Sequence, residues 1–326
     1  MKNHNFLISF LYLLFFSVHL FSLSKDLLTC VRPMGMGGAF CGIADDYNAV
    51  VWNPAGLDIL NRAEIGISYV KHFVDIYQLA SGFVLPTLTS GGFGIWFHYL
   101  DYGMFDYRNS IGEKTGNFTR KDTTSVVSYG RKLYEYGDRY LSLGGSVKYM
   151  HVNLRNIAEG SALSYDLGIL WQVNKAISFG YVFRNLLNIS NDTTGVKQKF
   201  ENFSFRIGSG IKPIRFLKLA CDIEGEKDNI LSLYSVGVEL AISNFYLRAG
   251  GMWYSKSIPQ ISYGFGLKSR KLMLNYAFLN HNELGYNHRI AVSLYFSKDS
   301  LLKLEKLEYE MIGANEFKIW EKADAE

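Results

Sequence analysis

The feature that most constrains the fold is a side-chain alternation with a period of two, repeated from about residue 62 to residue 296. In each segment one face is apolar and aromatic, while the other is small and polar. One segment places Leu141, Leu143, Val147 and Tyr149 opposite Ser142, Gly144, Ser146 and Lys148. Because successive side chains of an extended strand point to opposite faces, the pattern predicts about fourteen β-strands.

Alternation alone does not distinguish a secreted β-sandwich from a membrane β-barrel. Two features favour the barrel. Segments of about ten residues match the length that a tilted strand needs to cross a bilayer. The chain also contains 22 Tyr, 23 Phe and 5 Trp, and aromatic rings gather at membrane interfaces. We therefore predict an all-β fold, a transmembrane antiparallel β-barrel, with about twelve or about sixteen strands as the nearest alternatives to fourteen.

Composition excludes several other classes of protein. With 48% hydrophobic and 20% charged residues, the chain is too apolar to be disordered. Three cysteines are too few for a disulfide scaffold of this length. The net charge is only +4, with no long basic block, so nucleic acid is not a predicted partner.

Residues 1–24 have the pattern of an export signal peptide. Lys2 supplies the positive charge, residues 6–21 are mainly apolar, and Ser22-Leu23-Ser24 offers small residues for cleavage. An uncleaved anchor is the alternative, since the apolar run is close to spanning length. A lipoprotein signal at Cys30 is disfavoured by the charged pair at residues 25 and 26. A barrel with such a signal is expected in the bacterial cell outer membrane.

The mature chain divides into three parts. Residues 25–61 do not alternate and are predicted to form a compact N-terminal segment that is not part of the barrel wall, while residues 62–297 form the barrel. Residues 298–326 set leucines among lysines and glutamates, which predicts a short charged periplasmic helix or, alternatively, a frayed end. Within the barrel, the polar stretches 106–122 and 188–198 are predicted as an extended hairpin or surface loops.

The N-terminal segment, residues 25–61, contains a dense motif. It reads Arg32-Pro33-Met34-Gly35-Met36-Gly37-Gly38-Ala39-Phe40, then Ala44-Asp45-Asp46-Tyr47-Asn48-Ala49, then Trp52-Asn53-Pro54-Ala55-Gly56-Leu57. Its glycines permit backbone conformations barred to other residues and allow tight packing against a wall. The two aspartates are placed to cap a helical turn through Ala49. Asn53-Pro54 favours a turn, and the small residues Ala55 and Gly56 keep the side-chain volume at that turn low.

This motif resembles the start of the FadL-like outer-membrane proteins, and most closely their PorV/PorQ branch. Weaker echoes follow at Tyr165-Asp166-Leu167-Gly168 and Phe183-Arg184-Asn185-Leu186. The resemblance implies that the segment is a hatch inside the barrel. The hatch residues would be Arg32, Pro33, Gly35, Gly37, Gly38, Asp45, Asp46, Asn53, Pro54, Ala55 and Gly56. The alternative is a motif that only seats the plug and never moves.

No motif for catalysis stands out, so the chain is not expected to be an enzyme or to carry a cofactor. No G-x-S-x-G nucleophile elbow occurs. His281, Glu283 and His288 match no standard ligand spacing, so we expect a loop there and no metal site. Cys30 and Cys41 are candidates for pairing in an oxidising periplasm, which would leave Cys221 on a strand face.

Two functions follow from the resemblance. FadL-like proteins imply passive uptake of hydrophobic molecules such as long-chain fatty acids, with capture outside, rearrangement near the hatch and exit through a gap in the wall. The PorV/PorQ branch implies instead a scaffold in protein secretion or surface attachment, with secretion-machinery proteins as partners. The expected partners are therefore the outer-membrane lipid bilayer and a hydrophobic small molecule or fatty acid, with secretion proteins under the alternative.

Overall fold

The computed structural model describes residues 30–296, except for 73–74, 88–89, 155–157, 193–201, 227–228, 255–258 and 282–284. The expected signal peptide and C-terminal helix therefore lie outside the described residues. Among these residues, no helix has the length and apolar composition to cross a membrane.

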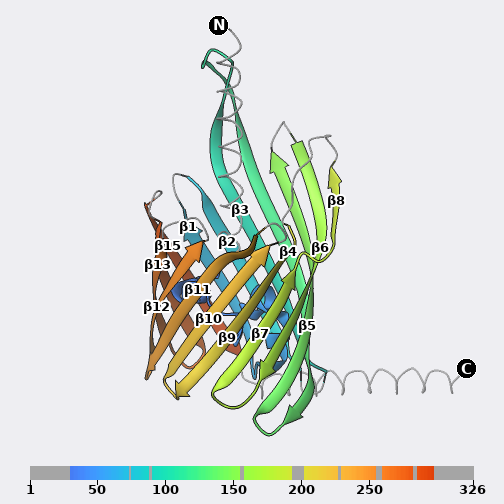
Figure 1. Ribbon diagram of the computed structural model, residues 1–326. Helices are drawn as coiled ribbons and strands as arrows, with labels where there is room; N and C mark the ends of the chain where they lie inside the picture. Colours follow the sequence, from blue (N-terminus) through green and yellow to red (C-terminus); the bar gives the residue numbers. More distant parts are fainter. Residues whose placement is uncertain are drawn as a thin grey trace, which may run out of the picture.

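Strands dominate the described chain (Figure 1). The first seven are β1 (Ala63–Lys71), β2 (Tyr77–Pro86), β3 (Gly92–Arg108), β4 (Lys114–Tyr136), β5 (Arg139–Leu154), β6 (Ala158–Gln172) and β7 (Ile177–Arg184). The next four are β8 (Asn188–Asp192), β9 (Ser204–Ile214), β10 (Leu217–Glu226) and β11 (Asn229–Ile242). The last four are β12 (Phe245–Tyr254), β13 (Gln260–Lys268), β14 (Leu272–His281) and β15 (Gly285–Phe296).

The strands close into a fourteen-stranded antiparallel barrel, as the alternation predicted. Each of β1 to β6 and of β9 to β14 pairs with the strand that follows it in the chain. β7 pairs with β9, and β15 pairs with β1, which closes the barrel. The closing pair runs in register from Ala63 opposite Phe296 to Lys71 opposite His288. We call these fourteen strands the wall. The last wall strand ends at Phe296, where the alternation predicted its end.

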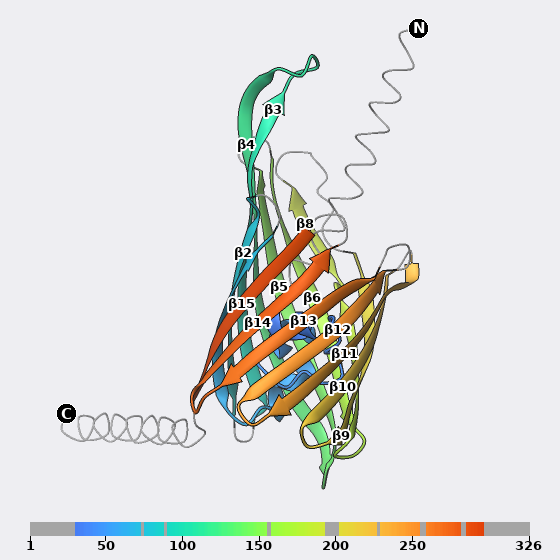
Figure 2. The ribbon, with the colours of Figure 1, turned by 90° about the vertical axis from the view of Figure 1, so that its left-hand side faces the viewer.

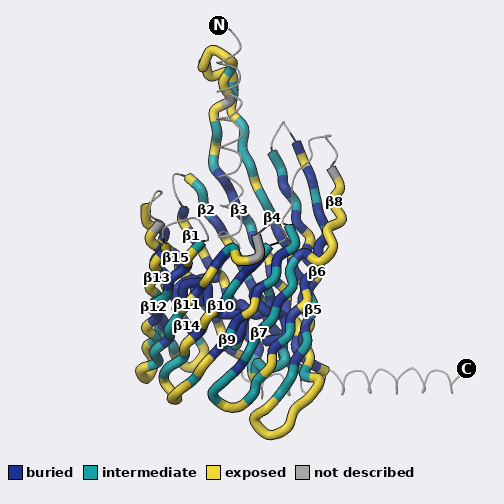
Figure 3. Tube along the Cα trace, in the orientation of Figure 1, coloured by how far each residue is buried: buried dark blue, intermediate teal, exposed yellow. Residues whose placement is uncertain are grey.

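The outer surface of the wall carries the apolar face. Ile67, Ile95 and Val127 are each more than half exposed, whereas the side chains of Ser142, Ser164 and Ser262 are fully buried in the interior. Figure 3 shows the resulting alternation of buried and exposed residues along the strands. An apolar exterior with a small, polar interior is the arrangement of barrels that face lipid.

The two ends of the barrel differ. One end has short turns, such as Gly137–Asp138 between β4 and β5 and residues 215–216 between β9 and β10. At the other end β3 and β4 rise beyond the other strands as a long hairpin (Figures 1 and 2). This hairpin confirms the prediction for residues 106–122. Short periplasmic turns and longer extracellular loops are typical of outer-membrane barrels, so we take the hairpin end as extracellular.

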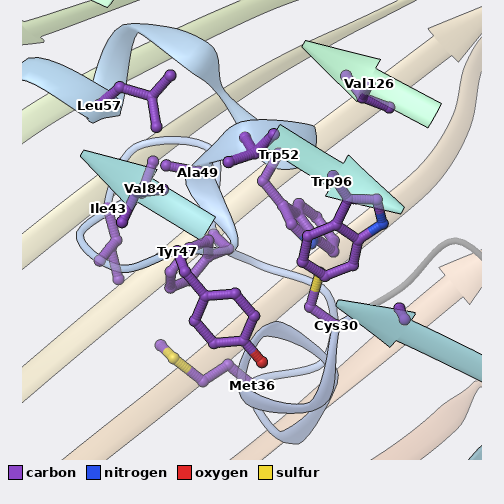
Figure 4. Close-up of a cluster of buried hydrophobic side chains, with 14 of the residues drawn as sticks. Cys30, Met36, Ile43, Tyr47, Ala49, Trp52, Leu57, Val84, Trp96 and Val126 are labelled. Atoms are coloured by element: carbon purple, nitrogen blue, oxygen red, sulfur yellow. The ribbon is translucent and has the colours of Figure 1, made fainter. Parts of the chain in front are cut away.

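Residues 30–60, which we call the plug, lie inside the barrel (Figures 1 and 4). The plug contains α2 (Val31–Gly35), α3 (Ala49–Trp52) and η1 (Pro54–Ile59). Its apolar side chains form one core with Val84, Trp96 and Val126 of the wall, and Tyr47 stacks on Trp96 with 5.8 Å between ring centroids. This shared core lets a chain with a polar barrel interior still bury apolar surface.

Candidate functional site

Arg32 ties the plug to the wall. Its Nε and Nη2 donate to the two carboxylate oxygens of Glu239 on β11, at 2.8 and 2.9 Å. Its Nη1 donates to Asp45 at 2.7 Å and to Asp46 at 2.8 Å. Both Arg32 and Glu239 are buried. A bidentate guanidinium–carboxylate pair away from water fixes position and orientation together, so Arg32 fixes where α2 sits.

Two wall cations extend this ion network. Arg248 on β12 donates from Nε to Glu239 at 2.7 Å, and Lys218 on β10 approaches Glu239 at 3.2 Å. Lys218 also donates to Asp45 at 2.8 Å. Burial raises the pKa of the Asp45 carboxyl, but Arg32 and Lys218 outweigh it and hold that pKa well below its usual range. Three cations thus face three carboxylates, which offsets the cost of burying them.

A second group of wall residues holds the part of the plug that follows Gly37. Asp222 on β10 accepts hydrogen bonds from the backbone N–H groups of Phe40 and Cys41, both at 2.9 Å. Arg206 on β9 donates to the carbonyl of Gly38 at 2.8 Å and pairs with Glu224, with 2.9 Å from Nε to the carboxylate. These wall charges satisfy plug backbone groups that the short helices leave open.

The other half of the plug is held mainly through uncharged groups. Asn53 is fully buried, and its Nδ2 donates to the carbonyl of Ile169 on β6 at 3.1 Å. Its Oδ1 accepts from the N–H of Ala55 at 3.2 Å, which is the predicted turn at Asn53-Pro54. Ser128 on β4 donates to the carbonyl of Val50 at 2.8 Å. The plug is therefore bonded to opposite sides of the wall.

Wall glycines allow the plug backbone to touch the strands. A Cβ added at any of them would meet plug atoms at 3.0 Å or less, which is closer than nearly all real Cβ contacts. They are Gly66, Gly82, Gly94, Gly130, Gly144, Gly168, Gly180, Gly210, Gly237, Gly250 and Gly264, each from a different strand. At Gly250 the close neighbours are Met36 and Gly37, and Gly37 itself has a positive φ of 62°. We call this set the glycine ring.

The wall strand after β6 is interrupted. β7 pairs with β9 as far as Arg184, opposite Ser204. The chain then turns at Asn185, which has a φ of 56°, and β8 pairs with the far half of β6. Among the described residues β8 has no pairing with β9. We call residues 185–187 the wall break.

Buried polar contacts hold the wall break in place. Asn185 accepts from Lys148 Nζ at 2.6 Å and from Ser164 Oγ at 3.0 Å. Its backbone N–H donates to Asp166 at 2.9 Å, and the next N–H, of Leu186, donates to the carbonyl of Tyr165 at 2.9 Å. Asparagine tolerates the left-handed region better than most residues. The interruption is therefore a built part of the wall.

Solved structures share this architecture. The toluene transporter TbuX of Ralstonia pickettii has a TM-score of 0.58 at 11% identity, covering 82% of this chain and 97% of that chain. The toluene transporter TodX of Pseudomonas putida has a TM-score of 0.55 at 12% identity, covering 81% and 95%. A FadL homologue of Pseudomonas aeruginosa has a TM-score of 0.51 at 9% identity, covering 82% and 98%.

The chain has the fold of the FadL-like barrels. No protein-family model matches its sequence, and no curated protein sequence does. The neighbours reported above are two transporters and a FadL homologue, not enzymes, which agrees with the expectation for this chain.

The predicted hatch residues lie together in the plug, in different surroundings. Arg32, Asp45 and Asp46 join the ion network, while Pro54, Ala55 and Gly56 are buried against the wall or the rest of the plug. Pro33 and Gly35 belong to α2. Gly37 and Gly38 have positive φ values, of 62° and 73°, whereas Gly35 does not and instead packs on Gly264.

The predicted capping role of the two aspartates is wrong. The N-cap of α3 is Asn48, and no side chain caps that helix. Asp46 Oδ1 accepts from the N–H of Asn48, one residue before the helix, and Asp45 turns to Arg32 and Lys218. Two cations nearby compete better for a carboxylate than a helix N-terminus does.

Three other sequence predictions concern the cysteines, the histidines and the stretch 188–198. Cys30 and Cys41 are both buried and both free, so the pairing left open by the sequence is not formed. His288 lies on β15 and contacts Tyr276 at 2.7 Å, and no metal-ligand cluster occurs in the described part of the chain. The stretch 188–198, predicted as an extended hairpin or surface loop, begins with strand β8 at Asn188–Asp192, which pairs with β6; its remainder lies outside the described residues.

The wall anchors were missed by sequence reasoning. Glu239, Asp222 and Arg206 stand on the small, polar face of their strands, where charged residues are scattered. That face is now known to be the interior, and a charge inside a barrel needs a partner there. Charged residues on the inner face were the only sequence signal for these three anchors.

Proposed function

We propose that this protein is an outer-membrane channel for hydrophobic small molecules. Solutes would enter from the extracellular end, be stopped by the plug, and leave sideways through the wall at the break between β7 and β8. The observation that carries the proposal is the combination of a plug touching the wall all round with a wall strand that is interrupted beside it. A barrel closed along its axis needs another exit, and a hydrophobic solute can enter lipid.

The side chains at the wall break support this route. Leu186, Leu187 and Ile189 are all more than two fifths exposed, and they lie just after Asn185, which follows the end of β7. They stand next to an edge of β8 that pairs with no described strand, and such exposed apolar side chains give an apolar solute a surface to cross. The similar structures support the proposal too, since two of them are toluene transporters.

Uptake by cells tests this proposal. The protein is produced in a bacterial strain that lacks its own channels for hydrophobic compounds, and uptake of labelled toluene and of a labelled fatty acid is measured. We expect faster uptake of at least one compound than in cells with the empty vector. Leu187→Glu should cut that uptake by about fivefold or more, because an apolar solute avoids a charge. Phe216→Glu, at an exposed turn of the opposite end, is the matched control. Uptake equal to that of the empty-vector cells would refute the channel.

A scaffold role of the PorV/PorQ kind is the second candidate, and the long β3–β4 hairpin favours it. This hairpin extends beyond the other strands (Figure 2). Arg120 forms a bidentate pair with Asp122, and Phe105 stacks on Phe118. Cross-linking in whole cells from this hairpin, compared with a variant shortened by residues 105–118, tests it. Loss of a specific protein adduct in the shortened variant supports the scaffold, and no adduct in either refutes it.

A further inference from the structure

The short turns at the periplasmic end of the wall carry a set of exposed cations. Arg131 and Arg139 flank the β4–β5 turn, Arg215 lies in the β9–β10 turn, and Arg270 and Lys271 lie in the β13–β14 turn. All five are exposed, and Figure 3 shows the turns of this end as exposed too. We call these five residues the basic rim.

The charge of the basic rim is not balanced by the protein. In the part of the chain that the structure describes, none of its five side chains forms an ion pair or a hydrogen bond. The two carboxylates beside the β4–β5 turn already face other cations. Lys132 Nζ lies 2.8 Å from the carboxylate of Glu135, and Lys175 Nζ lies 3.4 Å from that of Asp138. The basic rim therefore offers its charge to a partner.

The cations of the long β3–β4 hairpin, at the other end of the barrel, are paired. Arg108 and Lys114 face Asp106 at 3.1 and 2.7 Å, Arg120 faces Asp122 at 2.8 Å, and Lys121 faces Asp101 at 3.6 Å. A cation beside a carboxylate has little net charge to offer to a third group. The unbalanced positive charge of the basic rim is thus a property of the periplasmic end.

Exposed aromatic side chains stand beside the basic rim. Tyr134 and Tyr136 near the end of β4, Trp171 near the end of β6, and Phe216 next to Arg215 are all more than two fifths exposed. Tyrosine and tryptophan gather where a bilayer meets water, at the depth of the lipid headgroups. Basic side chains at that depth reach the headgroup phosphates.

The basic rim is spread around the barrel. In the order of strands around the wall, at least two strands separate each of its three turns from the next. A folded protein partner would dock on one side of the barrel, whereas lipid surrounds the whole wall. This distribution favours a lipid as the partner.

We propose that the basic rim binds the phosphate groups of anionic phospholipids in the inner leaflet of the outer membrane. A guanidinium presents paired N–H donors that match two oxygens of a phosphate. Phosphatidylglycerol has a net negative charge, whereas the ammonium of phosphatidylcholine cancels its phosphate. The basic rim should therefore prefer the first lipid. The inference goes beyond the proposed channel and does not depend on it.

Spin-labelled lipids test the proposal. The full-length protein is placed in phosphatidylcholine vesicles with a small amount of spin-labelled phosphatidylglycerol or spin-labelled phosphatidylcholine. Electron paramagnetic resonance then measures the share of each label in contact with the protein. We expect the wild type to prefer phosphatidylglycerol by about threefold or more at low salt. The preference should weaken in about 1 M NaCl, where the Debye length falls to about 3 Å.

A double variant locates the preference. Arg215→Glu/Arg270→Glu reverses one charge on each of two turns and should at least halve the preference, to about 1.5-fold or less. The matched control is Arg108→Glu/Lys114→Glu, which changes the net charge equally at the hairpin and should keep the preference. A shift in gel mobility on heating checks that each variant is folded. If the first variant does not fold, the salt dependence of the wild type decides.

The possible results are distinct. Equal association of the two labels with the wild type overturns the lipid assignment in favour of an acidic protein as the partner. A preference that salt does not weaken, or that Arg215→Glu/Arg270→Glu retains in full, overturns the role of the basic rim. An equal loss in both double variants does so too, because net charge alone would then set the preference. None of these results bears on uptake by cells, since no residue of the basic rim belongs to β7 or β8.

Discussion

Arg32 in the plug and Glu239 in the wall are 207 residues apart in the chain, yet two hydrogen bonds join them in the interior of the barrel. Each is buried, and each has further partners of opposite charge. Removing one member of such a pair leaves a charge without compensation in a dry site, which costs much more than the pair contributes when intact. Most of our predictions concern this contact and the plug that it holds.

Arg32→Met should loosen the plug. We expect a loss of about 3–5 kcal/mol in the free energy that holds the plug, because the buried carboxylates of Glu239, Asp45 and Asp46 then face only two cations, Arg248 and Lys218. Limited proteolysis of the purified protein, with cleavage sites in the plug identified by mass spectrometry, measures the change. The double variant Arg32→Met/Glu239→Met should be cut more slowly than the single one. Equal resistance of wild type and Arg32→Met would contradict the anchoring role.

Gly250→Ala should prevent normal seating of the plug. The added Cβ would overlap the backbone of Met36 and Gly37, which has no flexible end to move aside. Overpacking of this kind typically costs about 1–3 kcal/mol, and more where backbone must shift. Gly116→Ala, where an added Cβ meets nothing within 4 Å, is the matched control. The thermal midpoint of unfolding, followed by gel mobility, should drop for the first variant alone.

Asn185→Val should disturb the wall break. A β-branched residue is strained at a φ of 56°, and the substitution also removes the contacts to Lys148 and Ser164. Asn185→Gly relieves the strain without restoring those contacts. We expect a loss of stability of about 1–3 kcal/mol in the valine variant, with a smaller loss in the glycine variant. Equal losses would mean that the side-chain contacts matter and the backbone conformation does not.

The seating of the plug should depend on pH only in acid. The pKa of Asp45 is lowered in the folded protein, so its contribution to stability is complete above the unfolded value of about 4 and is lost as the pH falls toward the folded value. Trp52 and Trp96 lie at the plug, so tryptophan fluorescence reports its seating. The signal should be flat from about pH 5 to 8 and change below about pH 4. Asp45→Asn should remove much of that change.

The three cysteines should differ in reactivity. Cys30 and Cys41 are buried in the plug, and burial raises the pKa of both thiols, whereas Cys221 lies exposed on the outer face. A maleimide should label the folded protein once and the denatured protein three times, as counted by mass spectrometry. Reaction depends on the thiolate and on access. Fast labelling of Cys41 in the folded protein would show that the plug leaves its seat.

The fold was readable from the sequence because barrel strands have a strict chemical division between their faces. Segments such as Ile290–Phe296 carry apolar residues at every second position, and a shift of one residue would turn them all inward. That constraint set the strand type, the number of strands and the end of β15. The position of Asn185 was not readable, because one asparagine in a polar stretch is compatible with a loop, a turn or a strand end.

The contacts of the plug could be predicted from the sequence only in part. Glycines and Asn53-Pro54 act locally, through backbone conformation and a turn, so their residue types alone indicate their roles. The partners of Arg32 are set by barrel closure, which brings Glu239 beside it from the far part of the chain. Nothing within a few residues of either one indicates that pairing. The capping role assigned to Asp45 and Asp46 failed for the same reason, because it considered only neighbours along the chain.

The glycine ring also has a consequence for the order in which the molecule is assembled. These glycines belong to strands from β1 to β13, and each contacts the plug, which precedes all of them in the chain. A finished cylinder with such close contacts offers no clearance for a folded segment to be pushed in afterwards. The barrel must therefore close around a plug that already lies in place, so that folding of the plug and closure of the wall depend on each other.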